Sequence, residues 1–453
     1  MSHPAISCRT EFHRLPPFWD RRAVFIANIL SIFFGNREEV SELRREVGTL
    51  ESYGGRLIPV LDLLFSKKDN LLVLEQAADS CLLEYFLSLG LTLPRTCVIP
   101  EDFFRKYPGR MDAPVMEFLD RLRAEPASWL AGYVTDASLA FMAHQIGKEI
   151  LGTPEACQRG NNKLLLHDFL EGEGLGVFDT AKASDRKTVL NALETFRQQG
   201  YREAVIKAQI GASGVGMIRI AFDRPLPEGA LPDYLFYAGP VLVQGWLDGQ
   251  VLSVRLIASP SVQLFLDEKT CWIYDLTEQI LSRESVHEGN VAPPPCFERY
   301  PQMKGIMLEQ ASRVGAWLGA QGYQGTASID YHSIERAGRL EVRVCEVNAR
   351  VTGATYPAVL ARRLMPGHAW LMRNVRFARA LKGEKILERM QASGLLFETG
   401  KQEGVLPINF NLEASGQAVK GQFLFLAGKP DAVTALLLQL KELFSDFGDF
   451  DRD

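Results

Sequence analysis

The stretch VRVCEVNARVTG carries three side chains that can do chemistry. Glu346, Asn348 and Arg350 are two residues apart, so on a β-strand they project from the same face. Regular alternation also puts Val342 and Val344 on that face. The stretch therefore predicts a strand whose inward-facing side becomes polar near its end.

A partner for Glu346 is expected across a hairpin. The strands GTASIDYHS and RLEVRVCEVNAR flank a turn, and if this turn centres on Gly338, Asp330 lies opposite Glu346. Opposed side chains are about 4.5–5.5 Å apart at Cβ, where two carboxylates repel unless a proton or a cation joins them. Mg²⁺ suits this pair, with Asn348 as a neutral ligand and Arg350 placed to contact bound anions.

The alternative for this hairpin is an exposed strand face with solvated charges. The valines disfavour it, because an unpaired carboxylate on an inward face is costly. Arg343 and Cys345 are predicted to point to the other face and to be dispensable for the chemistry.

Three glycines, Gly211, Gly214 and Gly216, separate two strand-like runs in VIKAQIGASGVGMIRI. They match neither the dinucleotide fingerprint, because a strand follows instead of a helix, nor a Walker loop, because no GK[ST] follows. A glycine-rich tip can fold over phosphates, with Lys207 in the preceding strand as a point charge. A flexible surface hairpin is an equally good interpretation. Lys163, which begins the preceding helix, is a further phosphate ligand or an ordinary solvated lysine.

The segment VLVQGWLDG is an apolar strand that passes Gln244, Trp246 and Asp248. The backbone of such a strand can pair with the edge of an adenine while a polar side chain binds the ribose. A plain connection between domains, with Trp246 in a core, explains the pattern equally well.

Length, composition, net charge and cysteine count restrict the class of protein. A chain of 453 residues with 47% hydrophobic content predicts three or four packed domains or subdomains. A net charge of −5 disfavours nucleic acid as a partner, and seven dispersed cysteines without a CxxC pair indicate reduced thiols. AVFIANILSIFFG is too short to span a bilayer, and the N-terminus does not resemble a signal peptide. We therefore expect a soluble, cytoplasmic protein with no membrane partner, and a homodimer as the default assembly.

Strand-like runs alternate with helical patterns along the chain. AVFIANIL and NLLVLEQ are predicted strands, and CLLEYFLSLGL and SLAFMAHQIGKEIL are predicted helices, which indicates an open α/β sheet. NNKLLLHDFLEGEGLG and KTVLNALETFRQQG are also predicted helices, whereas LTEQILSRESVHEGNVAPPP is predicted to be a polar loop. GVLPINFNL, GQFLFLAG and the helix VTALLLQLKELF predict a small α/β cap before a frayed acidic tail.

Taken together, these features resemble the ATP-grasp superfamily over about 153–381, and the preceding section resembles the pre-ATP-grasp domain of some members. The resemblance implies an α/β fold with α+β elements. Its expected parts are an irregular arm (1–20), a pre-ATP-grasp α/β domain (21–152), a lid subdomain with the glycine loop (153–242), a metal-binding catalytic subdomain (243–386) and a small C-terminal α/β subdomain (387–453).

The resemblance also implies ATP and Mg²⁺ as ligands and assigns residues to them. Phosphates are assigned to Lys163, Lys207 and the flap Gly211, Ser213, Gly214 and Gly216, adenosine to Val243, Gln244, Trp246 and Asp248, and Mg²⁺ to Asp330, Glu346 and Asn348. Arg350 is expected to face the γ-phosphate or an acyl phosphate, and Arg255 to grip a substrate carboxylate. The sequence departs from the family at Gln244 or Gly245, where an acid is usual, and at Ala349, where proline is frequent.

The implied activity is ATP-dependent ligation of a carboxylate to an amine through an acyl phosphate. Peptide ligases of natural-product pathways and ligases that load an amino acid onto an acyl carrier protein are the resembling members. A kinase that phosphorylates a small molecule and a non-catalytic nucleotide-binding scaffold are the alternatives. Retention of Lys207 and of the candidate metal residues argues against the scaffold.

Overall fold

The computed structural model describes residues 6–12, 14–41, 54–101, 103–212, 214–226, 229–247, 254–282 and 287–445. Ser213, Asp248 and the acidic tail lie outside these residues. Within the described ranges, the helices are too short or too polar to cross a bilayer. All seven cysteines are free thiols, as predicted.

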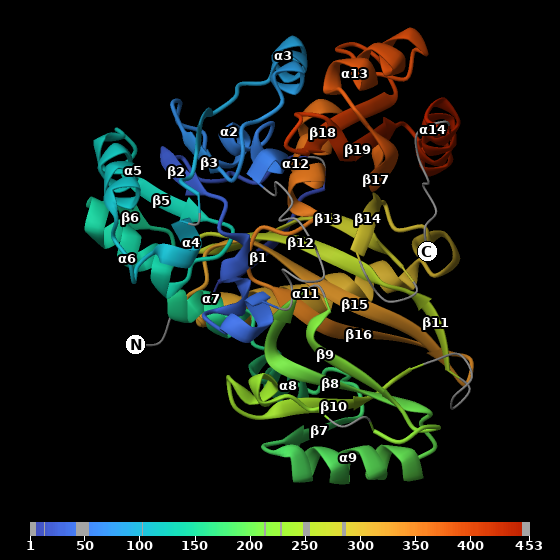
Figure 1. Ribbon diagram of the computed structural model, residues 1–453. Helices are drawn as coiled ribbons and strands as arrows, with labels where there is room; N and C mark the ends of the chain where they lie inside the picture. The colour runs from blue at the N-terminus through green and yellow to red at the C-terminus, as the bar shows by residue number, and fades with distance from the viewer. Residues whose placement is uncertain are drawn as a thin grey trace.

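The N-terminal domain is a five-stranded parallel sheet of order β4-β3-β2-β5-β6, drawn in blue and cyan in Figure 1. Successive residues of its central strand enter two different cores, so both faces are covered, which explains the uninterrupted apolar run of AVFI. Its strands are β2 (Ala23–Ile26), β3 (Leu71–Leu74), β4 (Arg95–Val98), β5 (Trp129–Gly132) and β6 (Glu149–Ile150). Its helices include η1 (Ile29–Phe33), η2 (Gly54–Leu57), α2 (Leu61–Leu64), α3 (Ser80–Ser88), α4 (Phe103–Lys106), α5 (Ala113–Ala124) and α6 (Ala137–Ile146).

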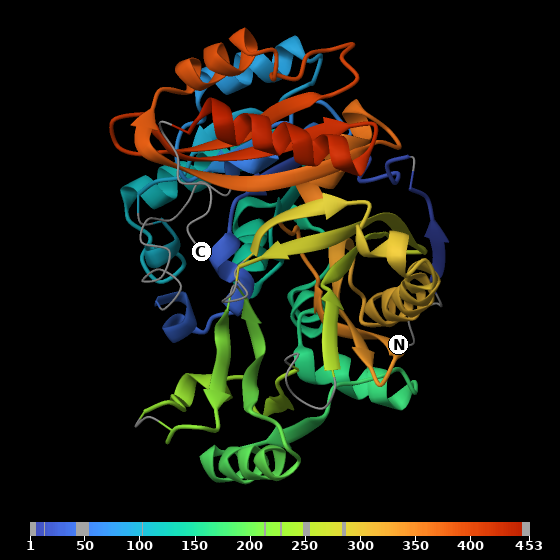
Figure 2. The ribbon, with the colours of Figure 1, turned by 90° about the vertical axis from the view of Figure 1, so that its right-hand side faces the viewer.

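A four-stranded antiparallel sheet of order β7-β10-β8-β9 forms the lid, at the bottom of Figures 1 and 2. Helix α9 packs on one face of this sheet, and α8 contacts the lid as well as strand β16 of the large sheet. The helices predicted before and within the lid are confirmed. The elements are α7 (Pro154–Gly160), α8 (Lys163–Gly172), β7 (Thr180–Ala183), α9 (Arg186–Gln198), β8 (Glu203–Ala212), β9 (Val215–Ala221), η3 (Asp233–Phe236) and β10 (Val241–Gly245).

The remaining strands join one ten-stranded sheet whose main order is β11-β15-β12-β13-β14-β17-β19-β18. Among the described residues, strand β16 pairs with β15 alone, and helix α14 lies across β19 and β17 (Figure 2). The strands are β11 (Val254–Ala258), β12 (Pro260–Leu266), β13 (Thr270–Leu281), β14 (His287–Ala292), β15 (Gly325–Arg336), β16 (Arg339–Asn348), β17 (Ala369–Leu381), β18 (Gly404–Leu412) and β19 (Ala418–Ala427). The helices are α10 (Cys296–Arg299), α11 (Gln302–Ala320), α12 (Thr355–Leu364), α13 (Gly383–Ala392) and α14 (Pro430–Leu443).

Two predictions about this region are wrong. Most of the expected polar loop LTEQILSRESVHEGNVAPPP is strand, because LTEQIL ends β13 and HEGNVA forms β14. Four residues of the expected irregular arm form β1 (Ser7–Thr10), which pairs in parallel with the start of β13. Both segments are held by pairing with distant strands, which their own sequences do not reveal.

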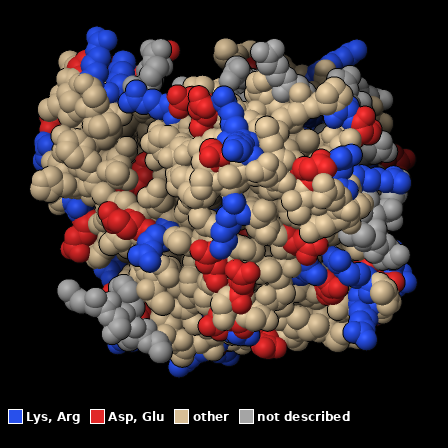
Figure 3. Space-filling view, turned by 90° about the horizontal axis from the view of Figure 1, so that it is seen from below, with Lys and Arg blue, Asp and Glu red and all other residues tan. Residues whose placement is uncertain are grey.

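A pocket lies between the lid and strand β16 of the β15–β16 hairpin. Helix α8 contacts both sheets, so residues at its start reach the lid and the hairpin (Figure 1). Seen from below, acidic and basic side chains are interspersed over the surface without one extended basic area (Figure 3).

Candidate active site

The hairpin of β15 and β16 sets the spacing of the candidate metal ligands. Its tight turn, Ala337–Gly338, has a positive φ at both residues, and the residues on either side of it pair directly. Continued without interruption, this register would place Cys345 opposite Asp330. A bulge at Cys345 instead brings Glu346 opposite Asp330. The predicted pairing of Asp330 with Glu346 is thus confirmed, but the bulge produces it.

The valines of β16 lie on a different face from the one predicted. Val342 and Val344 pair with Ser333 and Tyr331, whose hydroxyl groups contact α11. These two valines therefore pack on the α11 side of the sheet, away from Glu346. The extra residue in β16 shifts the alternation of its side chains, so the two valines and Glu346 lie on opposite faces of the sheet.

The prediction that Arg343 and Cys345 face away from the site is also wrong. Cys345 Sγ lies 4.0 Å from Lys207 Nζ, in a pocket that Lys163 also lines. Arg343 donates to the carbonyl of Val177, at 2.7 Å, on the wall of the same pocket.

Asp330, Glu346 and Asn348 converge on one another, next to the pocket that Lys163 and Lys207 line. The amide nitrogen of Asn348 donates to Asp330 Oδ2 at 2.8 Å and to Glu346 Oε1 at 3.5 Å. Ser261 Oγ donates to the other oxygen of Asp330, at 2.7 Å. Loss of hydration and the nearby charge of Glu346 raise the pKa of Asp330 to about 6. A cation between the carboxylates would relieve this repulsion.

Positive side chains keep Glu346 ionised. Its Oε2 lies 3.2 Å from Lys163 Nζ. Burial disfavours the Glu346 carboxylate, but the charges of Lys163, Arg350 and Lys207 outweigh it and lower the pKa. The site thus combines three cations with two carboxylates, a set suited to a polyanion bound together with a divalent cation.

Residues of this site fit Mg²⁺ better than they fit a metal held entirely by protein. The described ranges contain no group of three His, Cys, Asp or Glu side chains placed to hold a metal. Two carboxylates and one amide oxygen are enough for Mg²⁺, which takes few protein ligands and fills its shell with water and phosphate oxygens. Burial and the charge of Glu346 both raise the pKa of Asp330, and a bound cation would favour its charged form.

Lys163 also connects the hairpin to the glycine turn. Its Nζ donates to the carbonyl oxygen of Gly211, at 3.1 Å. The helix that begins at Lys163 is capped by the side chain of Asn162, whose amide nitrogen donates to Gln209 Oε1 of β8 at 2.7 Å. The start of α8 is therefore fixed to the strand that leads into the turn.

The glycine turn is narrow and tightly packed. Gly214 and Gly216 have φ values of 83° and 78°, which favour glycine. A Cβ on Gly216 would lie 2.6 Å from Glu39 Oε1 of the N-terminal domain, and one on Gly211 would lie 2.6 Å from a carbonyl oxygen of β9. The turn thus has close contacts that leave no room for side chains at these two positions.

A pocket between the lid and β16 is lined by both polar and apolar residues. Lys163, Lys207 and Gln244 are on its wall, with Gln244 Nε2 donating to Thr180 Oγ1 at 3.0 Å. The other residues that line it are Leu166, His167, Leu170, Val177, Phe178, Leu242, Val344 and Cys345. An apolar slot beside two lysines suits a flat base attached to phosphates.

The structure does not bring all the predicted adenosine contacts to this pocket. Val243 is fully buried in the lid, in a strand paired on both sides. Trp246 follows that strand, and the guanidinium of Arg219 lies 4.3 Å from its ring centroid. Asp248, like Ser213 of the expected flap, is outside the described residues.

Arg255 also lies apart from the other candidates. Its half-exposed guanidinium forms an ion pair with Glu335, at 2.7 Å, and donates to the hydroxyl of Tyr300. Glu335 is near the turn end of β15, five residues along the strand from Asp330.

Arg350 lies directly beside the candidate metal ligands. It donates to the side-chain oxygens of Asn348 and Asn161, the latter at 3.4 Å. Asn161 also bonds both the amide and the carbonyl of Ala349, each at 3.1 Å. Asn161 is a positioning residue that the sequence analysis did not identify.

Polar side chains on neighbouring strands extend the site and were missed. Gln263 donates to Ser261 Oγ at 3.0 Å and accepts from Thr352 Oγ1 at 3.4 Å. Gln279 of β13 acts to lower the pKa of Asp330, against its overall rise. In the sequence, these residues could have been found from the alternation of polar and apolar residues in SVQLFL and LTEQIL. The second of these segments was predicted to be a loop.

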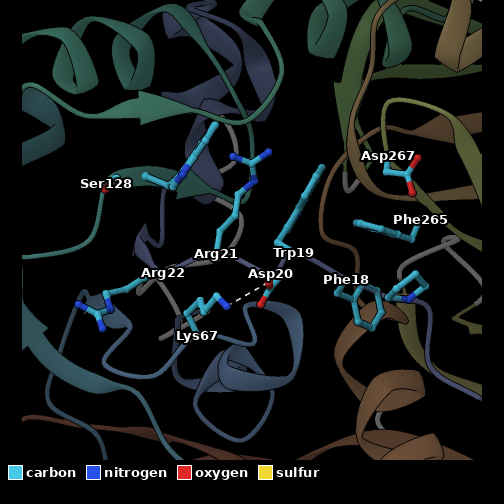
Figure 4. Close-up of a pocket in the computed structure, with 11 residues that line it drawn as sticks. Phe18, Trp19, Asp20, Arg21, Arg22, Lys67, Ser128, Phe265 and Asp267 are labelled. Atoms are coloured by element: carbon cyan, nitrogen blue, oxygen red, sulfur yellow. Dashed lines mark ion pairs between the residues drawn. The ribbon is translucent and has the colours of Figure 1, made fainter.

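A wide hollow lies elsewhere, between the N-terminal domain and the large sheet (Figure 4). Its Lys67 pairs with Asp20, at 3.1 Å, and its Arg21 guanidinium stacks 3.8 Å from the centroid of Trp129. None of the predicted site residues lines this hollow.

Comparisons with known proteins agree with this architecture. No protein-family model matches the chain. The butirosin acyl-carrier protein–L-glutamate ligase of Niallia circulans is 25% identical over 277 residues, which cover 58% of this chain and 63% of that protein. The match therefore spans less than two thirds of the relative.

Similar solved structures extend over nearly the whole chain. N5-carboxyaminoimidazole synthetase of Staphylococcus aureus, complexed with ADP, has a TM-score of 0.53 at 13% identity, covering 96% of this chain and 99% of that one. Biotin carboxylase of Campylobacter jejuni, in a β,γ-ATP complex, has a TM-score of 0.56 at 11% identity, covering 92% of this chain and 90% of that one. These likenesses, and the three sheets described above, confirm the predicted fold: the chain has the ATP-grasp fold, with a parallel N-terminal sheet and antiparallel grasp sheets.

Proposed function

We propose that the protein is an ATP-dependent ligase that joins a carboxylic acid to an amine and releases ADP and phosphate. The observation that carries this proposal is the placement of Lys163, which lines a pocket together with Lys207 and lies 3.2 Å from Glu346 of the Asp330–Glu346 carboxylate pair. Such a pocket holds a nucleotide triphosphate and leaves its terminal phosphate beside Arg350.

The chemistry requires activation of the acid. A carboxylate oxygen attacks the γ-phosphorus of ATP, the bond to ADP breaks, and an acyl phosphate forms. The amine then attacks the carbonyl carbon, phosphate leaves, and the amine proton passes to phosphate or solvent. No protein nucleophile is needed for either step.

The chain's own residues have distinct tasks in this scheme. Lys163 and Lys207 bind the phosphates, and the glycine turn covers them and limits entry of water, which would hydrolyse the acyl phosphate. Asp330, Glu346 and Asn348 would hold Mg²⁺, which, when bound, neutralises charge on the transferred phosphoryl group. Arg350 orients the acid and then the acyl phosphate by bidentate hydrogen bonding.

The acid is proposed to be an amino acid, and the acceptor a small amine or a carrier protein. The relative from Niallia circulans supports this choice, because its name gives an acyl carrier protein and L-glutamate as its substrates. A role in natural-product biosynthesis is part of the same proposal.

The test is a panel of amino acids incubated with ATP, Mg²⁺ and hydroxylamine, a small acceptor that traps acyl phosphates as hydroxamates. We expect ADP release that depends on one class of acid and matches hydroxamate formation. Asp330→Asn is expected to abolish both products. ADP formation with a stable phosphoester and no hydroxamate would establish the kinase instead, and nucleotide binding without turnover on any acid would favour the scaffold.

A further inference from the structure

The wide hollow between the N-terminal domain and the large sheet has no role in the ligase scheme (Figure 4). Its volume is about 450 Å³, within the range of roughly 300–1,000 Å³ that is typical of small-molecule sites. Residues 17–22, Lys67 and Trp129 line it from the N-terminal side, and Phe265 and Asp267 line it from β12 and the turn after it. The hollow is therefore large enough for an organic ligand that touches both parts of the chain.

The hollow is separate from the candidate active site, although one strand reaches both. Phe265 and Ser261 lie four residues apart on β12, and Ser261 Oγ donates to Asp330. Four strand residues span about 13 Å at about 3.3 Å per residue. None of the residues that line the hollow also lines the pocket of Lys163 and Lys207. A ligand in the hollow would thus occupy a different place from the nucleotide.

Arg21 provides the hollow with a cation whose hydrogen-bond donors are unused. Its guanidinium lies 3.8 Å from the ring centroid of Trp129 and 6.0 Å from that of Trp19, and Arg21 and Trp19 extend side by side (Figure 4). Within the part of the chain that the structure describes, Arg21 forms no ion pair and no hydrogen bond. Contact with a ring face leaves the N–H groups, which lie in the plane of the guanidinium, able to bind a carboxylate or a phosphate.

The other charged side chains that line the hollow already have partners. Lys67 pairs with Asp20 at 3.1 Å, and Arg22 pairs with Asp69 at 3.4 Å. Asp267 accepts hydrogen bonds from two backbone amides of the turn that follows it, each at 2.7 Å. Among the described residues that line the hollow, the charge that remains for a ligand is therefore positive, which favours an anion.

Aromatic side chains form an apolar wall of the hollow. Phe265 is fully buried, and the rings of Phe18 and Trp19 each pack edge-on against it, with centroids 5.0 Å apart. The backbone of Trp19 donates to the carbonyl of Leu64 at 3.0 Å and accepts from the amide of Ser66 at 2.9 Å. These contacts hold the wall in place before any ligand binds, and a flat apolar group can pack against it.

We propose that the hollow binds a small organic anion, a carboxylate or a phosphate on a flat apolar body, with the anion on Arg21 and the body against the aromatic wall. This site is additional to the nucleotide site and does not depend on the proposed ligase activity. Carboxylates and phosphates both present a pair of oxygens to a guanidinium, so the experiment decides between them.

Calorimetric titration of the full chain with simple probes tests the site. Saturating ADP and Mg²⁺ are present throughout, so that the nucleotide site is occupied. Phenylacetate and phenyl phosphate carry the two anions on a flat body, phenylacetamide has that body without a charge, and acetate and inorganic phosphate have the charge without the body. We expect one of the two phenyl anions to bind about tenfold or more tightly than phenylacetamide and than the matching anion without the ring.

Substitutions locate the binding. Arg21→Met removes the charge and should weaken binding of the preferred anion by about tenfold or more. Arg219→Met is the matched control, because the Arg219 guanidinium also lies near a ring, 4.3 Å from the centroid of Trp246, but pairs with Glu203 in the lid. It should leave the affinity unchanged. If Arg21→Met does not fold, Arg21→Lys gives the comparison, since it keeps the charge but loses the planar pair of donors and should also weaken binding.

Three results would overturn the inference: neither phenyl anion binds, phenylacetamide binds as tightly as the anions, or the folded Arg21 variant binds the anion as tightly as wild type. The titration measures binding and not turnover, so its result stands even if no acid yields ADP and the ligase proposal fails.

Discussion

Lys163 Nζ lies 3.2 Å from Glu346 Oε2 and 3.1 Å from the carbonyl oxygen of Gly211. One lysine thus joins the strand that carries the candidate metal ligands to the turn that would cover the phosphates. In the nucleotide complex, phosphate oxygens would replace some of these contacts of Lys163 Nζ. The same side chain would then bind ATP directly.

Lys163→Met should therefore reduce kcat/KM for ATP by about 10²-fold, because it removes a charge aimed at the transferred phosphate. The measurement is ADP release with a saturating acid. Lys182→Met is the control, since Lys182 is also a lid lysine but pairs with Asp168 on the exposed surface at 2.6 Å. Equal losses in both variants would contradict the assigned role of Lys163.

Glu346→Gln should raise the Mg²⁺ concentration needed for half-maximal ADP release by about tenfold or more, because one of two carboxylates is lost from a cation site. Glu335→Gln is the matched change at the other end of the same hairpin, where the carboxylate pairs with Arg255. It should leave the Mg²⁺ dependence unchanged. An unchanged Mg²⁺ dependence in Glu346→Gln would remove Glu346 from the metal site.

The Asp330–Glu346 pair was predicted from a turn centred on Gly338, but the turn as it forms would place Cys345 opposite Asp330, and a bulge restores the predicted pair. The sequence was not sufficient to predict which face Cys345 occupies. A bulge adds one residue to a strand, and the alternating pattern of the sequence does not reveal where it lies. Periodic segments predicted individual helices and strands, whereas the ATP-grasp fold was predicted from the resemblance of the combined motifs to that superfamily.

Other errors came from contacts between distant segments. Gln279 was assigned to a loop because its strand is polar where it borders the site, although that strand is paired in the sheet. Arg255 and Val243 were placed by analogy, and the structure puts the first in a surface ion pair and the second in the lid core. No local pattern shows which strands will be neighbours.

Glu75 should make stability depend on pH. Loss of hydration raises its pKa from 4.5 to about 7 in the folded protein. The folded state then binds the proton more tightly than the unfolded state, so the free energy of unfolding falls as pH rises from about 4.5 through 7. The Glu75→Gln variant has no carboxylate to ionise, so its free energy of unfolding should not fall in this way. Relative to wild type, its free energy of unfolding should therefore rise between pH 5 and pH 8, by at most about 3 kcal/mol at about 1.4 kcal/mol per pKa unit. Denaturant unfolding at the two pH values measures it, with exposed Glu84→Gln as the control that should show no such gain.

Gly216→Ala should destabilise the protein more than Gly229→Ala does. Both glycines have positive φ, 78° and 76°, so the backbone cost is similar, about 1–2 kcal/mol. Only Gly216 has a close neighbour, because its Cβ would lie 2.6 Å from Glu39 Oε1, whereas a Cβ on Gly229 meets nothing within 4 Å. In a double-mutant cycle, Gly216→Ala should cost less free energy of unfolding when Glu39 is already replaced by alanine. If the effects of the two substitutions simply add, the Glu39 contact is not the cause of the larger loss at Gly216.

Cys345 provides the sharpest test of the bulge, because the two possible faces predict opposite results. On the nucleotide face, where its Sγ lies 4.0 Å from Lys207 Nζ, a phenylalanine would project into the pocket. Cys345→Phe should then raise the KM for ATP about tenfold or more, as expected for about 1–3 kcal/mol of overpacking. Cys345→Ser keeps the volume and should stay close to wild type, and iodoacetamide should modify the thiol more slowly when ATP is bound. A Cys345→Phe variant with a normal KM for ATP, at unchanged Tm, would place this side chain on the other face and return the strand to regular alternation.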